Sequence, residues 1–224
     1  MYKKKIIIIG TGSQAKLICE GILKNNFVIK AFYDDFSRDE KRFFNFNKKK
    51  IPILNKIDLL NKYINKNNYF ICCIGKNFLR EKIISNFEKI YPLIKWYTYI
   101  AKTAQISSSV IIGKGSMIMD GVIINSFSKI GNHSIINTGC IVEHDNFFKN
   151  FVSLGPGVKT GGNVLIGCRS HIGTGTVIKN NITIRRDAVI GVGSVVVKDC
   201  SSSQIYFGVP AKKIKNRKKN DNYL

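Results

Sequence analysis

An apolar residue recurs at every sixth position from Ile106 to Val196, and this spacing constrains the fold more than any other feature of the chain. The first positions are Ile106, Ile112, Ile118, Ile124, Ile130, Ile136, Val142, Phe148, Leu154, Thr160, Ile166, Ile172, Ile178, Ile184, Ile190 and Val196, of which only Thr160 is not apolar. The second position is often glycine, and the fifth is usually small or β-branched. A fixed six-residue period predicts a parallel β-helix, in which each unit supplies one short strand and one corner and three units close a triangular coil.

Residues 1–98 lack this period and instead read as strands alternating with helices. We expect strands at 3–9, 27–33, 69–74 and 93–97, helices at 17–24 and 79–89, and a short helix at 58–63. This alternation predicts a small Rossmann-like α/β domain with a parallel sheet. The predicted organisation is therefore an α/β domain at 1–98, an all-β domain that forms a β-helix at 99–200, and a C-terminal extension with a basic tail at 201–224.

The formal net charge of +22 raises the question of nucleic-acid binding. Lysine is spread over the whole chain, and no DNA- or RNA-binding motif is present, so we predict no nucleic-acid partner. A basic surface would instead attract phosphorylated substrates such as coenzyme A and nucleotide sugars. No apolar run reaches the length of a membrane span, and the apolar start is too short for a signal peptide, which favours a cytoplasmic protein without a membrane partner.

The six cysteines show no spacing typical of metal ligands. Cys72 and Cys73 are adjacent, so that their side chains would point to opposite faces of a strand. We predict buried free thiols and no metal site.

A glycine-rich stretch, Gly10-Thr-Gly-Ser-Gln-Ala, follows the first predicted strand and precedes a helix. Gly12 would let the backbone approach a phosphate, and the helix N-terminus favours anions. Asp34 and Asp35 end the second predicted strand, where carboxylates bind ribose hydroxyls or base amides. The pattern predicts a nucleotide site and suits NAD as well as a nucleotide sugar.

His144 is the histidine with the clearest chemical context, because Glu143 and Asp145 flank it. It is third in its six-residue unit, and the equivalent residue one coil later is Gly162. An imidazole above a bare glycine would leave a notch for a thin ligand, and either carboxylate could orient the ring for general-base catalysis. The competing interpretation is a solvated histidine in an acidic corner. His133 and His171 are interpreted as ordinary corner or surface residues.

The chain resembles the bacterial sugar acyltransferases that include the UDP-bacillosamine N-acetyltransferases (PglD) and the sialic-acid O-acetyltransferases (NeuD). The resemblance covers nearly the whole length. It is carried by residues 10–16, Tyr33-Asp-Asp-Phe, Ile74-Gly-Lys-Asn, Asn137-Thr-Gly-Cys-Ile-Val-Glu-His-Asp, the glycine-studded units and Gly208-Val-Pro-Ala-Lys. It implies a left-handed β-helix, a homotrimer, and acetyl-CoA bound along the coil between neighbouring subunits.

The resemblance also implies roles for individual residues. His144 matches the general base and Asp145 its acidic partner. The matches to nucleotide-sugar contacts are Gly12, Ser13, Gln14, Asp34, Asp35 and Gly75, and Asn137 matches a position near the acceptor. Thr174 and Val192 align with acetyl-CoA contacts. Two positions depart from the family pattern, with Gln14 in place of a usual histidine, and Ser153 in place of a second histidine that touches the thioester.

The predicted function is acetyl-CoA-dependent N-acetylation of a nucleotide-linked amino sugar, such as a UDP-4-amino-4,6-dideoxy sugar, in cell-surface glycan biosynthesis. Gly162 and Ser153 are counted with the acetyl-CoA contacts. The alternatives are O-acetylation of a sialic acid or related sugar and a non-catalytic β-helix binding module. A dinucleotide oxidoreductase is disfavoured, since no set of catalytic residues for such a reaction accompanies the glycine-rich stretch.

Overall fold

The computed structural model describes residues 4–35, 43–65 and 67–218. Contacts within the chain divide it into two compact units. Unit 1 comprises Met1–Gly75 and Leu79–Tyr97, and unit 2 comprises Lys76–Phe78 and Thr98–Leu224.

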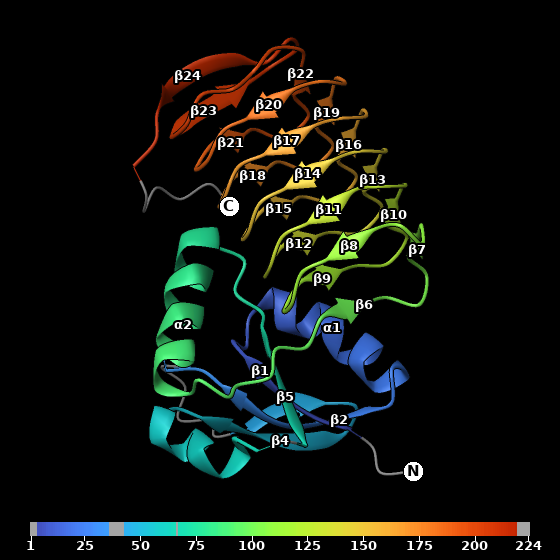
Figure 1. The fold of residues 1–224 in the computed structure, drawn as a ribbon. Helices are drawn as coiled ribbons and strands as arrows, with labels where there is room; N and C mark the ends of the chain where they lie inside the picture. Colours follow the sequence, from blue (N-terminus) through green and yellow to red (C-terminus); the bar gives the residue numbers. More distant parts are fainter. Residues whose placement is uncertain (1–3, 36–42, 66, 219–224) are drawn as a thin grey trace. The chain divides into compact units, whose positions relative to one another are not determined.

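Unit 1 is built on a five-stranded sheet with the strand order β3-β4-β2-β1-β5 (Figure 1). Its elements are β1 (Lys4–Ile9), α1 (Ser13–Lys24), β2 (Phe27–Tyr33), β3 (Phe43–Phe46), β4 (Lys49–Leu54), the 3₁₀ helix η1 (Ile57–Tyr63), β5 (Asn68–Cys72) and α2 (Asn77–Ile90), whose first two residues belong to unit 2. Strands β1, β2, β4 and β5 pair in parallel, so their carboxyl ends meet at one edge of the sheet. The predicted βαβ arrangement is present.

Three predictions for unit 1 need correction. Helix α1 begins at Ser13, four residues earlier than predicted. The strand predicted at 93–97 is reduced to a single bridge between Phe70 and Trp96. The hairpin of β3 and β4 was not predicted; it pairs antiparallel around Asn47 and Lys48, which both have positive φ, as tight hairpin turns require.

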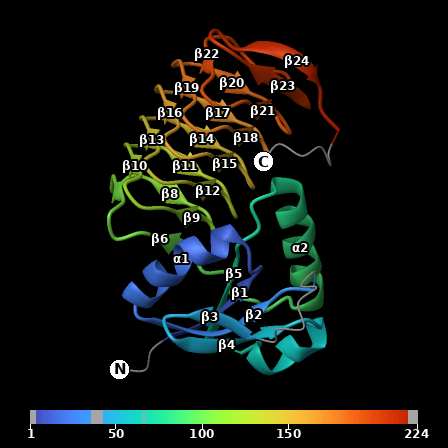
Figure 2. The ribbon, with the colours of Figure 1, turned by 180° about the vertical axis from the view of Figure 1, so that it is seen from behind.

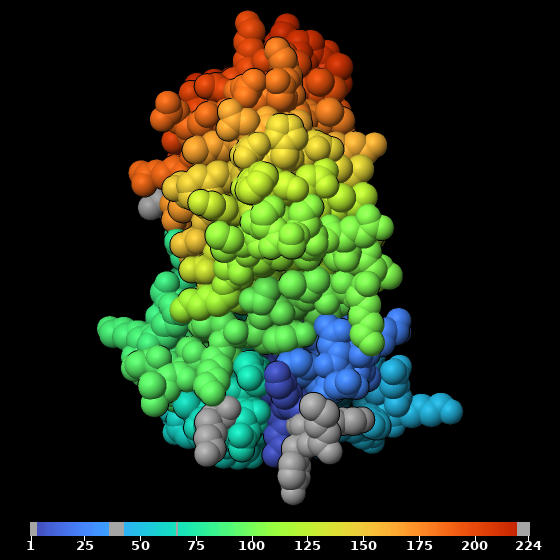
Figure 3. All heavy atoms as spheres, turned by 45° about the vertical axis from the view of Figure 1, so that its right-hand side comes forward, coloured from blue at the N-terminus to red at the C-terminus, as the bar shows by residue number. Residues whose placement is uncertain are grey.

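Unit 2 is a parallel β-helix, as the six-residue period predicted, and it is of the left-handed type that the family resemblance implied. Short strands stack in three parallel sheets, and partner residues are one coil apart, for example Ile123 and Ile141. Figures 1 and 2 show the three columns of strands, and Figure 3 shows the successive coils as bands of colour. The strands are β6 (Tyr99–Ile100), β7 (Gln105–Ile106), β8 (Ile111–Ile112), β9 (Met117–Ile118), β10 (Ile123–Ile124), β11 (Lys129–Ile130), β12 (Ile135–Ile136), β13 (Ile141–Val142), β14 (Phe147–Phe148), β15 (Ser153–Leu154), β16 (Lys159–Thr160), β17 (Leu165–Ile166), β18 (His171–Ile172), β19 (Val177–Ile178), β20 (Thr183–Ile184), β21 (Val189–Ile190) and β22 (Val195–Val196).

The apolar first positions fill the axis of the β-helix, and nearly all of them are fully buried. Most second-position glycines have a distinct packing role, because a Cβ there would strike the backbone of the next coil; at Gly191 it would strike the Phe207 side chain. A Cβ on Gly155 would come within 2.6 Å of the Thr174 nitrogen, and one on Gly161 within 2.5 Å of the Asn180 nitrogen. These glycines therefore set how closely the coils stack.

The C-terminal extension adds two strands to the β-helix. β23 (Gln204–Phe207) pairs in parallel with β21, and β24 (Lys212–Asn216) pairs antiparallel with β23. Part of the basic tail is therefore an ordered strand, although its residues are exposed.

All six cysteines are free, and five of them are buried. Burial raises the pKa of the Cys72 thiol to about 12 and that of Cys73 well above its ordinary value. These thiols therefore stay protonated at neutral pH and behave as small apolar side chains.

Candidate functional site

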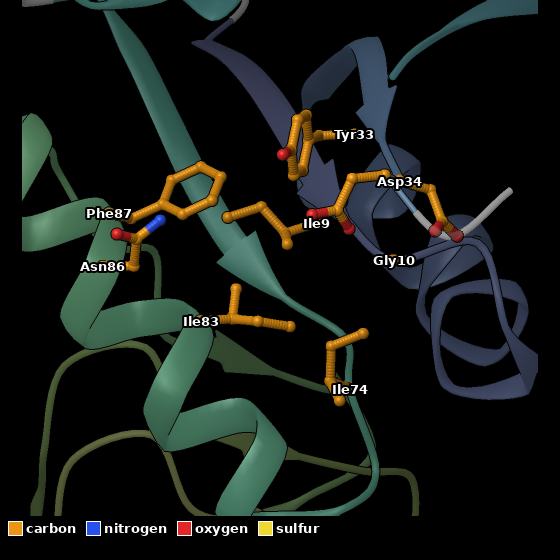
Figure 4. Close-up of a pocket in the computed structure, with 9 residues that line it drawn as sticks. Ile9, Gly10, Tyr33, Asp34, Ile74, Ile83, Asn86 and Phe87 are labelled. Carbon is orange, nitrogen blue, oxygen red and sulfur yellow. The ribbon is translucent and has the colours of Figure 1, made fainter. Parts of the chain in front are cut away.

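A pocket lies at the carboxyl ends of β1, β2 and β5 in unit 1, where ligands bind in open parallel sheets (Figure 4). It is lined by Ile9, Gly10, Tyr33, Asp34, Asp35, Ile74, Ile83, Asn86 and Phe87. Asn86 and Phe87 come from α2 and lie opposite Tyr33 in the close-up. The pocket combines apolar walls with a few convergent polar groups, which is typical of a small-molecule site.

Asp34 stabilises the glycine-rich turn through two hydrogen bonds from Thr11. Its Oδ2 accepts a hydrogen bond from the Thr11 backbone N–H at 3.1 Å and another from the Thr11 hydroxyl. The Gly10 N–H donates to the Tyr33 carbonyl at 2.8 Å. Asp34 lines the pocket, and its carboxylate also holds the glycine-rich turn in place.

Tyr33 and Asp35 form a polar pair at the rim. Burial, followed by the charge of Asp35 and a hydrogen bond to its carboxylate, raises the pKa of Tyr33 to about 12. The phenol therefore remains protonated and is a hydrogen-bond donor at any physiological pH.

The other residues predicted in unit 1 lie around this turn. Gly12 is the N-cap of α1, and Ser13 and Gln14 open its first turn, the end of a helix that favours an anion. The carbonyl of Gly75 accepts a hydrogen bond of 3.0 Å from the buried Arg80. Sequence reasoning missed Ile83, Asn86 and Phe87, since nothing in the helical pattern shows which residues of α2 border the pocket.

The second candidate site is the corner between β13 and β14 in unit 2, which carries His144. The imidazole Nδ1 lies 2.8 Å from Asp145 Oδ2, and the side chain of His144 is 62% exposed. A Cβ on Gly162 would come within 2.5 Å of His144 Cε1. The predicted stacking of the imidazole above a bare glycine is therefore confirmed.

The two carboxylates beside His144 have different partners. Asp145, with a left-handed backbone at φ 58°, bends back to the imidazole. Glu143 Oε2 instead accepts a hydrogen bond from Asn125 Nδ2 at 3.1 Å, from the coil before. Asp145 therefore orients the ring, and Glu143 links two coils.

Ser153 is buried, and its hydroxyl donates to Asn77 Oδ1 at 2.6 Å. Asn77 Nδ2 in turn donates to the carbonyls of Arg169 and Ser170 at 3.1 and 3.0 Å. The single hydroxyl proton of Ser153 is thus already used within unit 2. Its contact with a thioester stays a prediction.

Two of the predicted acetyl-CoA contacts lie at a different corner from His144, whereas Gly162 lies against its imidazole. Thr174 and Val192 are exposed, are one coil apart, and follow β18 and β21, whereas His144 follows β13 in a neighbouring sheet. Their separation by one coil forms a column parallel to the axis, which suits an elongated ligand. Asn137 donates from Nδ2 to the Leu154 carbonyl at 2.6 Å.

His133 and His171 are both buried corner or strand residues, so the surface alternative for them is wrong. His133 stacks on Phe151, with ring centroids 5.5 Å apart.

Within the described ranges, no group of three or more His, Cys, Asp or Glu side chains is placed to hold a metal ion. In the same part of the chain, no helix is long and apolar enough to cross a bilayer.

A hexapeptide-repeat β-helix with a His–Asp pair at one corner, joined to an α/β domain with a pocket at the carboxyl edge of its parallel strands, defines a class of acyltransferases. Comparison with known proteins agrees. Residues 5–87 match the model of the PglD N-terminal domain. PerB from Caulobacter crescentus, solved with CoA and GDP-perosamine, is 30% identical, with 94% of this chain and 97% of that chain covered and a TM-score of 0.84.

Two further relatives are similar. The acetyltransferase domain of PglB from Neisseria gonorrhoeae, solved with acetyl coenzyme A, is 28% identical over 95% of this chain and 100% of that chain, with a TM-score of 0.84. A dTDP-4-amino-4,6-dideoxy-D-glucose acyltransferase of Escherichia coli is 32% identical over 50% of this chain and 56% of its own length. The chain spans about half or less of the length of the curated relatives it matches. It belongs to the hexapeptide-repeat sugar acyltransferase family of the PglD and perosamine N-acetyltransferase type.

Proposed function

We propose that the protein transfers the acetyl group of acetyl-CoA to the amino group of a nucleotide-linked amino sugar, with His144 as the general base. The observation that carries the proposal is the exposed imidazole of His144, held by Asp145 above Gly162. With Nδ1–H donated to the carboxylate, Nε2 keeps its lone pair and is the nitrogen that accepts a proton.

The proposed reaction is direct transfer. The acceptor amine attacks the thioester carbonyl and loses a proton to His144 Nε2, a C–N bond forms, and the C–S bond breaks. The protonated imidazole then returns its proton to the departing thiolate of coenzyme A. Asp145 stabilises the imidazolium in between.

The nucleotide part of the acceptor is assigned to the pocket of unit 1. The N-terminus of α1, which begins after the Gly10–Gly12 turn, favours a diphosphate, and the Asp35 carboxylate, which accepts the hydrogen bond of Tyr33, offers a further acceptor to the base or ribose. The relatives bind or act on GDP- and dTDP-linked amino sugars. Such a pocket favours N-acetylation of a nucleotide-linked sugar over O-acetylation of a free sialic acid.

We assign acetyl-CoA to a cleft shared by two subunits of a homotrimer. His144 lies at one corner of the coil, and Thr174 and Val192 lie at another, so one ligand would meet both sets of residues where the corners of two chains face each other. Ser153 and Asn137 remain predicted contacts of the thioester and the acceptor.

The test is thiol release from acetyl-CoA with GDP-, dTDP- and UDP-linked 4-amino sugars as acceptors. We expect turnover with one of them, and His144→Ala should lower kcat by about 10²–10⁴-fold, the usual contribution of a positioned general base. Retention of more than half of the wild-type turnover by this variant would show that the amine loses its proton elsewhere. Absence of turnover with all three, beside tight binding of one, would favour the binding module.

A further inference from the structure

Two buried residues of the β-helix, Asn146 and Thr160, differ in type from the residues usual at their positions in the six-residue unit. Both contact the turn that carries His144. Asn146 is the only amide at the fifth position of a unit, where the other residues are small or β-branched. Thr160 is the only polar residue at the first position. They are 1% and 3% exposed.

Hydroxyl residues at the fifth position show what this position ordinarily does. Ser170 Oγ donates to the Arg185 carbonyl at 2.8 Å and accepts from the Ala188 N–H at 3.2 Å. Ser116 does the same with Gly131 and Ser134. The hydroxyl thus links its own coil to the next one.

Asn146 makes both of these links and adds others. Nδ2 donates to the Gly161 carbonyl at 3.0 Å, and Oδ1 accepts from the Val164 N–H at 3.2 Å. In addition, Nδ2 lies 2.5 Å from the Glu143 carbonyl and 3.3 Å from the His144 carbonyl, so that its two hydrogens are shared among three carbonyl oxygens. A serine hydroxyl makes the first two bonds elsewhere in this chain, so the amide is needed only for the carbonyls that flank the catalytic imidazole.

Thr160 acts on the same segment from the axis of the β-helix. Its Oγ1 accepts a hydrogen bond from the Glu143 N–H at 3.3 Å. Ser128 Oγ donates to the Glu143 carbonyl at 2.8 Å. The backbone on the N-terminal side of His144 is therefore held through both its N–H and its carbonyl group by buried side chains, whereas the imidazole itself is exposed.

We propose that Asn146, assisted by Thr160, is a positioning residue for the general base, which holds the His144 turn so that Nδ1–H faces Asp145 and Nε2 remains the acceptor. This inference rests on the proposed function. Side-chain burial of an amide costs free energy unless it is hydrogen-bonded, and a fully bonded buried amide rigidifies its surroundings. The bonds from Asn146 to the Glu143 and His144 carbonyls therefore rigidify the backbone that carries the exposed imidazole of His144. The proposed role of this imidazole requires a fixed tautomer.

The test uses Asn146→Ser and Thr160→Val, each of which restores the chain's own repeat and should leave the fold intact. Ser116→Ala is the matched control, because it removes the inter-coil links at another corner without touching the His144 turn. The first readout is the ¹⁵N chemical shifts of the imidazole nitrogens in histidine-labelled protein, which has only three histidines. The second is steady-state transfer from acetyl-CoA to GDP-perosamine, and the third is the thermal midpoint.

We expect Asn146→Ser to lower the Nδ1–H fraction of His144 and to reduce kcat about tenfold, since displacement of a catalytic group by 1 Å can cost on the order of 10²-fold. The acetyl-CoA KM and the thermal midpoint should stay near their wild-type values. Thr160→Val should change the ring signals and kcat in the same direction by less. Ser116→Ala should lower the midpoint and leave the His144 signals unchanged.

Wild-type ring signals of His144 in both Asn146→Ser and Thr160→Val would overturn the inference, whatever happens to kcat. That result leaves the proposed function standing if His144→Ala is inactive. Conversely, altered ring signals beside an active His144→Ala variant would support the positioning role and reject the catalytic one.

Discussion

Two carboxylates flank His144 in the sequence, but at the residue scale they do different things. Asp145 reaches the imidazole Nδ1 because its left-handed backbone turns the side chain back over the corner. Glu143, at a second position, is directed along the stack of coils to Asn125. The left-handed conformation of Asp145 therefore decides which of the two carboxylates contacts His144.

Asp145→Asn tests this assignment with little change in shape, because asparagine also tolerates the left-handed conformation. The variant keeps a hydrogen-bonding side chain but removes the charge that stabilises the imidazolium. We expect kcat to fall by about tenfold, equivalent to about 1.4 kcal/mol in the barrier, and the acetyl-CoA KM to change little. Steady-state acetyl transfer measures both. A loss as large as that of His144→Ala would give Asp145 a direct role in the chemistry.

At the element scale, adjacent glycines in one unit have different neighbours. A Cβ on Gly161 meets the backbone of the next coil at Asn180, whereas a Cβ on Gly162 meets only the imidazole of His144. The first glycine is therefore required by coil stacking and the second by the position of the proposed base.

Gly161→Ala and Gly162→Ala form a matched pair that separates the two roles. Gly161→Ala should destabilise the β-helix by about 1–3 kcal/mol, the usual cost of overpacking, because the backbone it strikes has no room to move. Gly162→Ala should leave the thermal midpoint nearly unchanged, since the exposed imidazole can swing away, and should lower kcat about tenfold or more through misplacement of the base.

Thermal denaturation and steady-state kinetics on both variants make the comparison. Full activity in Gly162→Ala would mean that the imidazole works from a position other than the one above Gly162. Equal loss of stability in the two variants would mean that Gly162 also has a role in stacking.

At the scale of the whole molecule, the three faces of the β-helix differ in exposure. On the face of β9, β12 and β15, Met117 and Ile135 are fully buried. The other two faces and their corners expose Ile111, Phe127, Phe147 and Val177, with 67% exposure of Phe127. We interpret these exposed apolar side chains as part of an interaction surface, and the corner between these two faces carries His144.

We predict a homotrimer, which covers these faces and brings two corners of different chains together. Sedimentation velocity at micromolar concentration should give a mass of about three times the 25.2 kDa chain. Phe147→Glu should shift the distribution towards smaller species and lower the activity in parallel, because the shared cleft would open. A stable wild-type monomer under these conditions would contradict the prediction.

Much of the fold could be predicted because the β-helix repeats one local rule. Each six-residue unit meets the equivalent positions of its neighbours, so the pattern from Ile106 to Val196 specifies both the strand and its register. The stacking of His144 on Gly162 could be predicted for the same reason, since both are third residues one coil apart. In unit 1, the glycine-rich turn and Asp34 could be expected to lie together, because each follows a strand of a parallel sheet and the carboxyl ends of such strands meet at one edge.

Tertiary structure decided the features that depend on contacts distant in sequence or on backbone conformation. The choice of Asp145 over Glu143 depends on a corner torsion, and the contribution of Asn86 and Phe87 depends on how α2 packs. The Ser153 hydroxyl donates to Asn77, which is 76 residues away in the sequence, and the six-residue pattern does not indicate this bond. The sequence by itself determined the repeat and the chemistry available at each position, because these are local properties. The hydrogen-bond partner of each buried polar group was decided only by the tertiary structure, because more than one donor or acceptor in the sequence could have satisfied it.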